Sequence, residues 1–525
     1  MIDLESTTLS PDERALLREY QPKGICLFRR NFASIEQSQD LTATLRDLCG
    51  DALLISTDQE GGSVVRALFV PHSPGNMALG AVGDVAVTRA SATITARGLQ
   101  QLGVNVNLAP VADVNNNPHN PVIGDRSFGS DPEAVSEHVT AFVSGLQAGG
   151  IAATLKHFPG HGNTAVDSHH GLPEIDRSRK QLAALELRPF RAGIKAGAAG
   201  VMTFHGMLPK LDPDYPATLS KIIMTGLLRQ QLGFDGVVFS DALEMAAIAK
   251  NYSAAEATLL ALNAGVDMPN SNAHNRQDSG GVRYHRQTFD ALAQAEHNGQ
   301  IDPALLSLAA KRLERLAQRF PVPAHPINTD TNTTHNNTIN TDAINTDETD
   351  TDVTDSDTRY LAAVSQRAVT TVASWGDITA IDLAKPILLV AADNRVGGSA
   401  SDVIDTPARV LTTKLEQANF TVRSLFYQPD TLPDLTSINQ NMADCQLLFV
   451  SASRHRLSAA EGQFAQQLAQ QTHSAVHIAL WNPYSCAVVG LPAVVSFGFA
   501  AAGLEQVIAV LTGTPAQGRL PIALV

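Results

Sequence analysis

The sequence has few cysteines and lacks any long apolar run. Its four cysteines (Cys26, Cys49, Cys445 and Cys486) lie far apart in 525 residues, without the spacing of a zinc site or a disulfide framework. We expect four buried, reduced thiols. No stretch approaches the roughly 18 consecutive apolar residues of a transmembrane helix. The N-terminus has no basic segment followed by an apolar one, so no secretory signal is expected and a cytoplasmic location is predicted.

An excess of basic residues is also lacking. The net charge is −14, whereas phosphate-rich surfaces are bound by clustered Lys and Arg. We therefore expect no nucleic-acid partner and no membrane partner. Much of the acidity lies in one stretch, residues 321–358, so the net charge says little about the substrate.

Residues 321–358 consist mainly of Asn, Thr and Asp and contain almost no apolar side chains. Such a composition cannot form a core, which predicts a disordered linker. Its Asp-rich end lacks the glycine and final glutamate of an EF-hand loop, so calcium is not expected. Because 525 residues are too many for one core, we predict a domain at 1–320 and a second at 359–525.

The first domain alternates short apolar runs with amphipathic stretches. The runs, which predict strands, are 24–32, 52–62, 104–114, 151–158, 200–206, 236–245 and 264–269. The helical patterns between them include 84–102, 131–149, 178–197 and 253–264. This alternation predicts a parallel sheet covered by helices, either a β/α barrel or an open doubly wound sheet.

Polar residues near the predicted C-terminal strand ends favour the barrel. They are Asp58, Asp113, Lys156, His157, His205, Asp241 and Asp267. In a barrel these ends converge on one pocket, whereas an open sheet binds ligands only at its switch point. We therefore predict an α/β fold with a (β/α)8 TIM-type barrel. Residues 359–525 again alternate strands and helices, which predicts a smaller αβα sandwich domain without a nucleotide-binding motif.

The segment KHFPGHGNTAVDSHH at 156–170 is rich in histidine. His157 and His161 have the spacing of a zinc pair on a helix, but Pro159 and Gly160 between them break any helix. A shaped loop after the fourth predicted strand is the better interpretation. Within it, Asp167 and His169 are two residues apart, and a carboxylate beside an imidazole orients the ring for proton transfer.

Asp241 ends the buried run GVVFSD, where an aspartate is either a helix N-cap or a reactive carboxylate. With the histidine loop it makes a nucleophile and an acid/base for glycoside cleavage. Two further segments, DQEGG at 58–62 with Arg66 and GDRSFG at 124–129, combine charged residues with glycines. Such segments suit hydrogen bonding to sugar hydroxyls.

In this order, DQEGG, GDRSFGSDP, KHFPGHG with DSHHGLP, and GFDGVVFSDALEM resemble family 3 glycoside hydrolases of the NagZ type. The resemblance runs from about Gly24 to Asp267 and resumes at WNPYSC and GRLPIAL, which resemble the αβα sandwich domain of that family. The histidine loop is typical of its β-N-acetylglucosaminidase branch. In the β-glucosidase branch the acid is a carboxylate supplied largely by the second domain.

The resemblance implies a retaining exo-β-N-acetylglucosaminidase in which Asp241 is the nucleophile, His169 the general acid/base and Asp167 its dyad partner. The residues implied to hold N-acetylglucosamine (GlcNAc) are Asp58, Arg66, Arg126, Lys156 and His157. No metal or organic cofactor is required, and the expected state is a monomer or homodimer. Two departures from the family pattern, Ala242 in place of a second aspartate and Asn163 where Asp is frequent, bear on substrate preference more than on activity.

The implied substrates carry terminal β-linked GlcNAc, as in cell-wall muropeptides, which fits cytoplasmic peptidoglycan recycling, or in chitooligosaccharides. Three alternatives stay open: a β-N-acetylglucosaminide phosphorylase with the same residues, a metal-dependent barrel hydrolase, and a non-catalytic sugar-binding protein. The polar stretch at 270–287 is either a contact for the leaving group or a plain surface loop.

Overall fold

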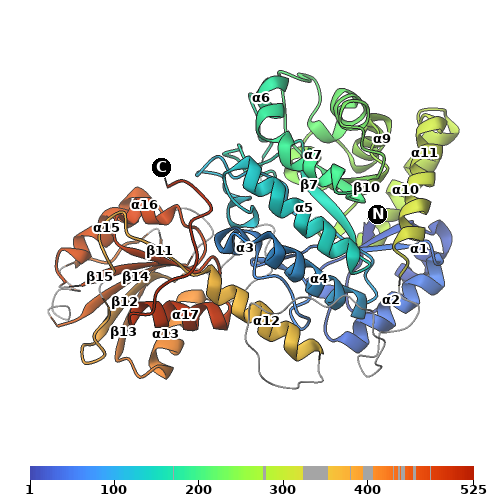
Figure 1. Ribbon diagram of the computed structural model, residues 1–525. Helices are drawn as coiled ribbons and strands as arrows, with labels where there is room; N and C mark the ends of the chain where they lie inside the picture. The colour runs from blue at the N-terminus through green and yellow to red at the C-terminus, as the bar shows by residue number, and fades with distance from the viewer. Residues whose placement is uncertain are drawn as a thin grey trace.

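The computed structural model describes residues 1–169, 171–275, 280–322, 353–378, 380–393, 406–429, 431–435, 438, 444–452, 457–472 and 474–524. Its first domain, coloured from blue to yellow in Figure 1, contains a parallel sheet with helices around it. The strand order in this sheet is β1-β2-β3-β6-β7-β8-β9-β10. The strands are β1 (Ile2–Asp3), β2 (Gly24–Leu27), β3 (Leu54–Thr57), β6 (Val106–Asn107), β7 (Ala152–Phe158), β8 (Gly200–Thr203), β9 (Val237–Ala242) and β10 (Met268–Asn270). Ile2 forms a parallel bridge with Ser271, which joins β1 to the end of β10. The predicted TIM-type barrel is confirmed.

The eighth strand is the one that the sequence pattern did not predict. β1 consists of only two residues, too few to show a periodicity, and it lies at the very start of the chain. Its neighbours hold it in place on both sides, because it pairs with β2 and the Met1 amino group donates to the Pro269 carbonyl at 2.8 Å. Without β1 the seven predicted strands leave a gap between β2 and β10.

Helices cover the outside of the barrel. They are α1 (Pro11–Tyr20), α2 (Ile35–Cys49), α3 (Asn76–Val82), α4 (Val85–Gln101), α5 (Pro132–Ala148), α6 (Arg179–Ala184), α7 (Leu187–Lys195), α8 (Ala246–Ala249), α9 (Ala254–Ala264), α10 (Gly281–His297), α11 (Pro303–Arg319) and a π-helix at Ile222–Gln231. The single helix predicted at 178–197 is wrong, because the backbone breaks at Leu185. The break turns Glu186 inward, where it is buried against Arg177 and Asn116.

The second domain is a sheet between two helical layers, as predicted. Its strands are β11 (Thr370–Val372), β12 (Ile387–Ala392), β13 (Val422–Tyr427), β14 (Gln446–Ser451), β15 (Ala475–Ala479) and β16 (Ala493–Val495), in the order β11-β16-β15-β14-β12-β13. Helices α13 (Pro407–Gln417) and α17 (Ala501–Leu511) pack on one face, and α15 (Ala459–Ala469) and α16 (Ser485–Val489) on the other. The two edge strands, β11 and β13, were not predicted, because β11 is short and β13 is partly exposed.

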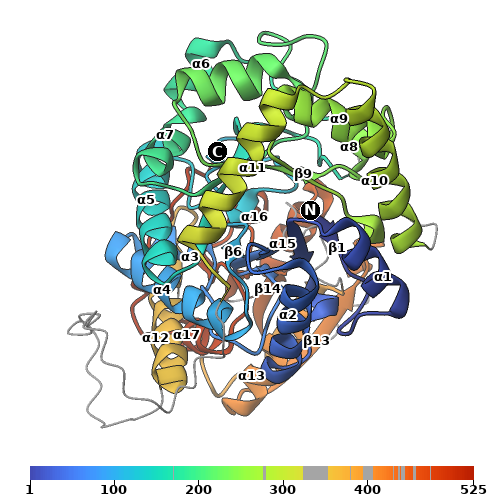
Figure 2. The same ribbon diagram turned by 90° about the vertical axis from the view of Figure 1, so that its right-hand side faces the viewer.

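Helix α12 (Val353–Ala368) lies between the two domains (Figure 1). Its Asp357 pairs with Arg97 of α4, and its Val364 belongs to the barrel core. The predicted end of the linker at residue 358 is therefore wrong, since a helix already begins at Val353. Of the rest of the predicted linker, residues 323–352 lie outside the described residues. In Figure 2 the second domain lies behind the barrel, on the far side from α11.

The four cysteines, all among the described residues, are buried thiols that form no disulfide with one another, as expected. Among the residues that the structure describes, no helix is both long enough and apolar enough to cross a membrane.

Candidate active site

The C-terminal ends of the barrel strands enclose a cavity of about 230 Å³. The predicted site residues that line it are Asp58, Arg66, Arg126, Lys156, His157, His169 and Asp241. Residues far apart in the chain therefore share one cavity. Asp267 does not belong to this group, and its predicted place at a C-terminal strand end is wrong. It precedes β10, accepts the Val238 amide at 2.8 Å and pairs with Arg229 and Arg312, at the opposite end of the barrel.

Two strands change register where they reach the cavity. Between β7 and β8 the paired residues shift from Leu155↔Val201 to Phe158↔Thr203, so β7 contains one extra residue at its end. A bulge of this kind disrupts the strict alternation of side chains. As a result the consecutive residues Lys156 and His157 both line the cavity.

A similar shift occurs between β9 and β10, from Met268↔Phe239 to Asn270↔Ala242. Here the consecutive residues Asp241 and Ala242 both line the cavity. Because of these two register shifts, consecutive residues at the ends of β7 and of β9 line the same cavity.

Five charged side chains form a paired cluster on one wall. Lys156 Nζ lies 2.7 Å from Asp58 Oδ1 and 2.6 Å from Glu60 Oε1. Arg126 binds Glu60 through two nitrogens, at 2.8 and 2.9 Å, and Arg66 lies 3.1 Å from Asp58. Three cations against two carboxylates leave one net positive charge, with donors and acceptors fixed in place for a polar ligand.

The pairing keeps this cluster ionised despite its burial. Burial alone raises the pKa of Asp58, but Lys156 and Arg66 outweigh it and hold that pKa below its usual value. Glu60 behaves in the same way, with its pKa lowered by Arg126 and Lys156 against the effect of burial. Burial lowers the pKa of Lys156, yet Asp58 and Glu60 raise it overall.

Glu60 is a site residue that the sequence analysis did not select, although its segment was noted. It is 2% exposed and joins Lys156 to Arg126, so it connects two of the predicted sugar-binding residues. The signal that could have found it is its place two residues after Asp58 in the DQEGG segment. Asp113, noted only for its position at a strand end, fixes His157: its Oδ2 lies 2.7 Å from His157 Nδ1.

The loop that follows β7 is held against the barrel. The His161 amide donates to Asp113 Oδ1 at 2.7 Å, and the His161 ring lies within hydrogen-bond distance of Thr164 and Ser168. A side chain at Gly162 would place its Cβ 1.7 Å from the Val114 carbonyl oxygen, so this close approach requires glycine. His161 thus shapes the loop, while His170 lies outside the described residues.

This loop carries the predicted dyad. His169 Nδ1 lies 2.8 Å from Asp167 Oδ1, and the same oxygen accepts the His169 amide at 2.9 Å. The carboxylate fixes the ring through Nδ1, which leaves Nε2 as the nitrogen that can exchange a proton with a ligand. The His169 side chain is 24% exposed, so it stands where the cavity opens.

Asp241 lies at the end of β9. Its Oδ1 accepts the Ala242 amide at 2.8 Å. Burial raises its pKa, but His205, His157 and His169 oppose that effect, and the net pKa is lower than usual. Asp241 is therefore an ionised carboxylate facing a cavity. Burial lowers the pKa of His205, whose Nε2 donates to the Ala242 carbonyl at 2.9 Å and so supports the same turn.

Several buried histidines should make stability depend on pH. Burial lowers the pKa of His161 and of His477 to about 3, and burial with Arg519 lowers that of His138 to about 4. In the unfolded chain these histidines bind protons near pH 6.5, whereas in the folded protein they stay neutral to a lower pH. The free energy of unfolding therefore has its full value above pH 6.5 and decreases as the pH falls. We expect the free energy of unfolding to decrease between pH 6.5 and 4.5, by up to about 1.4 kcal/mol per pH unit for each such histidine.

Urea unfolding at a series of pH values measures this slope. Replacement of His477, which lies in the second domain away from the cavity, by leucine should make the slope shallower. An unchanged slope in that variant would show that His477 does not contribute to the pH dependence of the free energy of unfolding. A free energy of unfolding that does not change with pH in the wild type would contradict a contribution from all three histidines.

His157 lies in strand β7 and not on a helix, so the zinc pair considered from its spacing with His161 is not formed. Within the described part of the chain, no three His, Cys, Asp or Glu side chains are grouped to hold a metal ion.

Comparisons with known proteins place this site in context. Residues 2–316 match the Glycosyl hydrolase family 3 N terminal domain. The chain is 38% identical over 341 residues to Beta-hexosaminidase A of Pseudoalteromonas piscicida, a match that covers 60% of this chain and 56% of that protein. The chain thus spans little more than half of that relative's length.

Two further comparisons cover a larger share of the protein to which this chain is similar. A Beta-hexosaminidase of Chromobacterium violaceum is 39% identical over 275 residues, which cover 51% of this chain and 76% of that protein. The structure of a family 3 beta-N-acetylglucosaminidase from Paenibacillus sp. str. FPU-7 superposes with a TM-score of 0.85 at 34% identity, and covers 100% of this chain and 97% of that one. The similarity to that structure therefore includes both domains.

Proposed function

Because this chain belongs to glycoside hydrolase family 3, we propose that it is a retaining exo-β-N-acetylglucosaminidase. The observation that carries the proposal is that an ionised carboxylate, Asp241, and an imidazole held by a carboxylate, His169 with Asp167, serve one polar cavity. Relatives at 38–39% identity that are named beta-hexosaminidases support the same activity.

In the first step of the proposed mechanism, Asp241 attacks the anomeric carbon of the terminal sugar. The glycosidic bond breaks as His169 gives its Nε2 proton to the leaving oxygen, and a covalent glycosyl–Asp241 intermediate forms. Asp167 accepts the Nδ1–H of His169 throughout, so the ring keeps its orientation when it gains or loses the other proton.

In the second step, a water molecule attacks the same carbon. His169, now without its Nε2 proton, takes one proton from that water, and the bond to Asp241 breaks. Two displacements at one carbon return the sugar with its β configuration. The step consumes only water and restores both side chains.

The charged cluster would hold the sugar during both steps. Asp58, Arg66, Arg126, Lys156 and His157 offer carboxylate acceptors and cationic donors to the hydroxyl groups of GlcNAc. We propose the terminal β-linked GlcNAc of muropeptides or chitooligosaccharides as the substrate, with a role in peptidoglycan recycling for the first. The cytoplasmic location stays a prediction.

The test is hydrolysis of an aryl β-GlcNAc glycoside beside its glucose analogue, with the first product followed by NMR. We expect β-GlcNAc as the first product and a kcat/KM at least about 100-fold above that for the glucoside. α-GlcNAc as the first product would contradict the double displacement. A preference for the glucoside would contradict the proposed substrate.

Two additions separate the alternatives. GlcNAc-1-phosphate formed in proportion to added phosphate would identify a phosphorylase, which needs the same residues with phosphate in place of water. Loss of activity in EDTA, restored by zinc, would identify a metal-dependent hydrolase.

A further inference from the structure

The segment after β10 forms a wall of the cavity that the charged cluster does not reach. Asn270, Asn272 and His274 line the cavity, whereas Ser271 and Ala273 between them do not. The alternation is that of an extended chain with one face toward the cavity. Of the polar stretch at 270–287, residues 276–279 lie outside the described residues.

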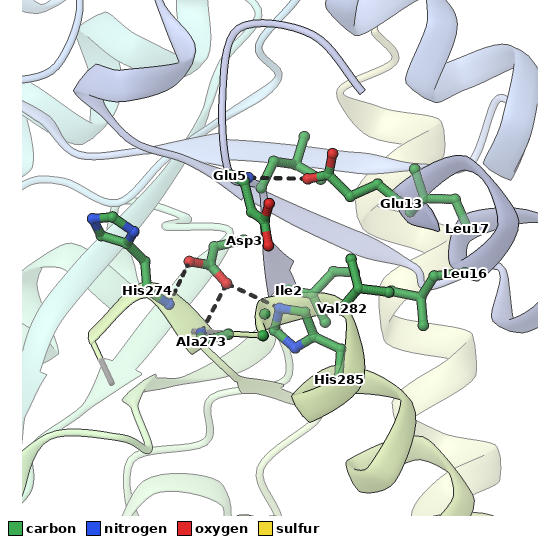
Figure 3. Close-up of a pocket in the computed structure, with 13 residues that line it drawn as sticks. Ile2, Asp3, Glu5, Glu13, Leu16, Leu17, Ala273, His274, Val282 and His285 are labelled. Carbon is green, nitrogen blue, oxygen red and sulfur yellow. Dashed lines mark hydrogen bonds and ion pairs between the residues drawn. The ribbon is translucent and has the colours of Figure 1, made fainter. Parts of the chain in front are cut away.

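Two buried carboxylates hold this segment from behind. Asp3 accepts the Ala273 amide at 2.9 Å and the His274 amide at 3.2 Å, and it lies 3.0 Å from His285 Nε2. Figure 3 shows Asp3 between these three groups. Glu244 accepts the Ser271 hydroxyl at 2.9 Å and the Asn272 amide at 2.6 Å. The backbone of the wall is therefore fixed by the barrel itself.

The side chains of this wall carry unused acceptors. Asn270 and Asn272 are 3% and 4% exposed, and the Oδ1 atom of each is buried without a hydrogen-bond partner. A buried carbonyl oxygen without a partner is costly, so such atoms in a binding cavity indicate donors that arrive with a ligand. Neither oxygen accepts a hydrogen bond from the cationic cluster, whose Lys156, Arg126 and Arg66 are paired with Asp58 and Glu60.

The wall lies beside the proposed nucleophile. Asn270 is paired with Ala242 in the sheet, one residue after Asp241, and neighbouring strands are about 4.8 Å apart. The small Ala242 side chain also lines the cavity and leaves room next to the carboxamide. Asn270 therefore lies within reach of the substituents nearest the anomeric centre, which are the group on C2 and, across the ring oxygen, the C6 hydroxyl.

We propose that Asn270 and Asn272 bind the terminal sugar by accepting hydrogen bonds from its O–H or N–H groups, and so help to determine which hexose enters. The inference rests on the proposed function and adds two substrate-binding residues to it. The donor is a group close to the anomeric carbon: the acetamido N–H on C2 or the hydroxyl on C6.

The test measures kcat/KM for an aryl β-GlcNAc glycoside with Asn270→Ala and Asn272→Ala, together with thermal unfolding. Each variant should lose about 10-fold in kcat/KM while its Tm stays the same or rises, because the substitution removes an unpaired buried oxygen. A purely structural asparagine would instead lower Tm when replaced. Asn251→Ala, at an exposed turn, is the matched control and should leave both values unchanged.

Analogues identify the donor. A substrate that lacks the donor group has no hydrogen bond to lose when the asparagine is replaced, so wild type and variant should then have nearly equal kcat/KM. We expect this equality with the 6-deoxy glycoside if the C6 hydroxyl is the donor, and with the 2-deoxy glycoside if the group on C2 is the donor. Unchanged kcat/KM in both variants, or the same ratio with every analogue, would overturn the inference. Absence of GlcNAc glycoside hydrolysis by the wild type would instead contradict the proposed function.

Discussion

Replacement of Asp241 by alanine is expected to abolish turnover, with a fall in kcat of about 10⁴-fold or more. The variant retains the cavity, the dyad and the charged cluster, but no other group can form the bond to the anomeric carbon. The nearby carboxylates are already engaged, Asp58 and Glu60 with Lys156 and the arginines. Steady-state hydrolysis of an aryl β-GlcNAc glycoside measures the loss.

Two controls make this result specific. Asp235→Ala removes a carboxylate just before β9, at the opposite end of the same strand, where it pairs with Arg312 and Arg315; its kcat should stay within about twofold of wild type. Azide added to Asp241→Ala should restore cleavage of a reactive aryl glycoside and yield the α-glycosyl azide, because azide then attacks from the face that the carboxylate occupied. Retention of more than about 1% of kcat by Asp241→Ala would contradict the role of nucleophile.

The sequence predicted the barrel because its longer strands are almost continuously apolar and are followed by polar residues. It did not predict β1, which is too short to show a pattern and is defined only by pairing at both ends of the sheet. Asp267 was misplaced for a related reason. The strand in the run AGVDMP is β10, which begins at Met268, so Asp267 immediately precedes a strand rather than ending one.

The candidate site was predicted through residue types rather than geometry. Alternation along a strand forbids Lys156 and His157 from facing the same way, and only the bulge at the end of β7 permits it. The position of Glu60 two residues after Asp58 hints at a role, but the roles of Glu60 and Asn270 become clear only from the groups around them in the structure. Glu60 is identified by two cations, Lys156 at the end of β7 and Arg126 in the 3-10 helix at Gly124–Arg126, and Asn270 by an acceptor that no donor of the described residues reaches.

If His169 is the general acid, the effect of His169→Ala should depend on the leaving group of the substrate. The kcat/KM for chitobiose should fall by about 10²- to 10⁴-fold, since its leaving oxygen needs the proton from Nε2. A dinitrophenyl β-GlcNAc glycoside should lose no more than about 10-fold in kcat/KM, because its leaving group departs as a stable anion. The parameter kcat/KM reports the steps up to the first bond cleavage, so it isolates the acid role from the later base role.

Replacement of Asp167, the other member of the dyad, should give a smaller effect of the same kind. Asp167→Asn leaves the His169 ring in place but removes the charge that stabilises it when protonated, so its losses should have the same dependence on leaving group and be smaller. His297→Ala, at the exposed end of α10, serves as the matched control and should leave both substrates unaffected. Equal losses on chitobiose and on the dinitrophenyl glycoside would contradict the acid role of His169. The ring would then act by shaping the cavity, and the proton for the leaving group would have to come from another residue.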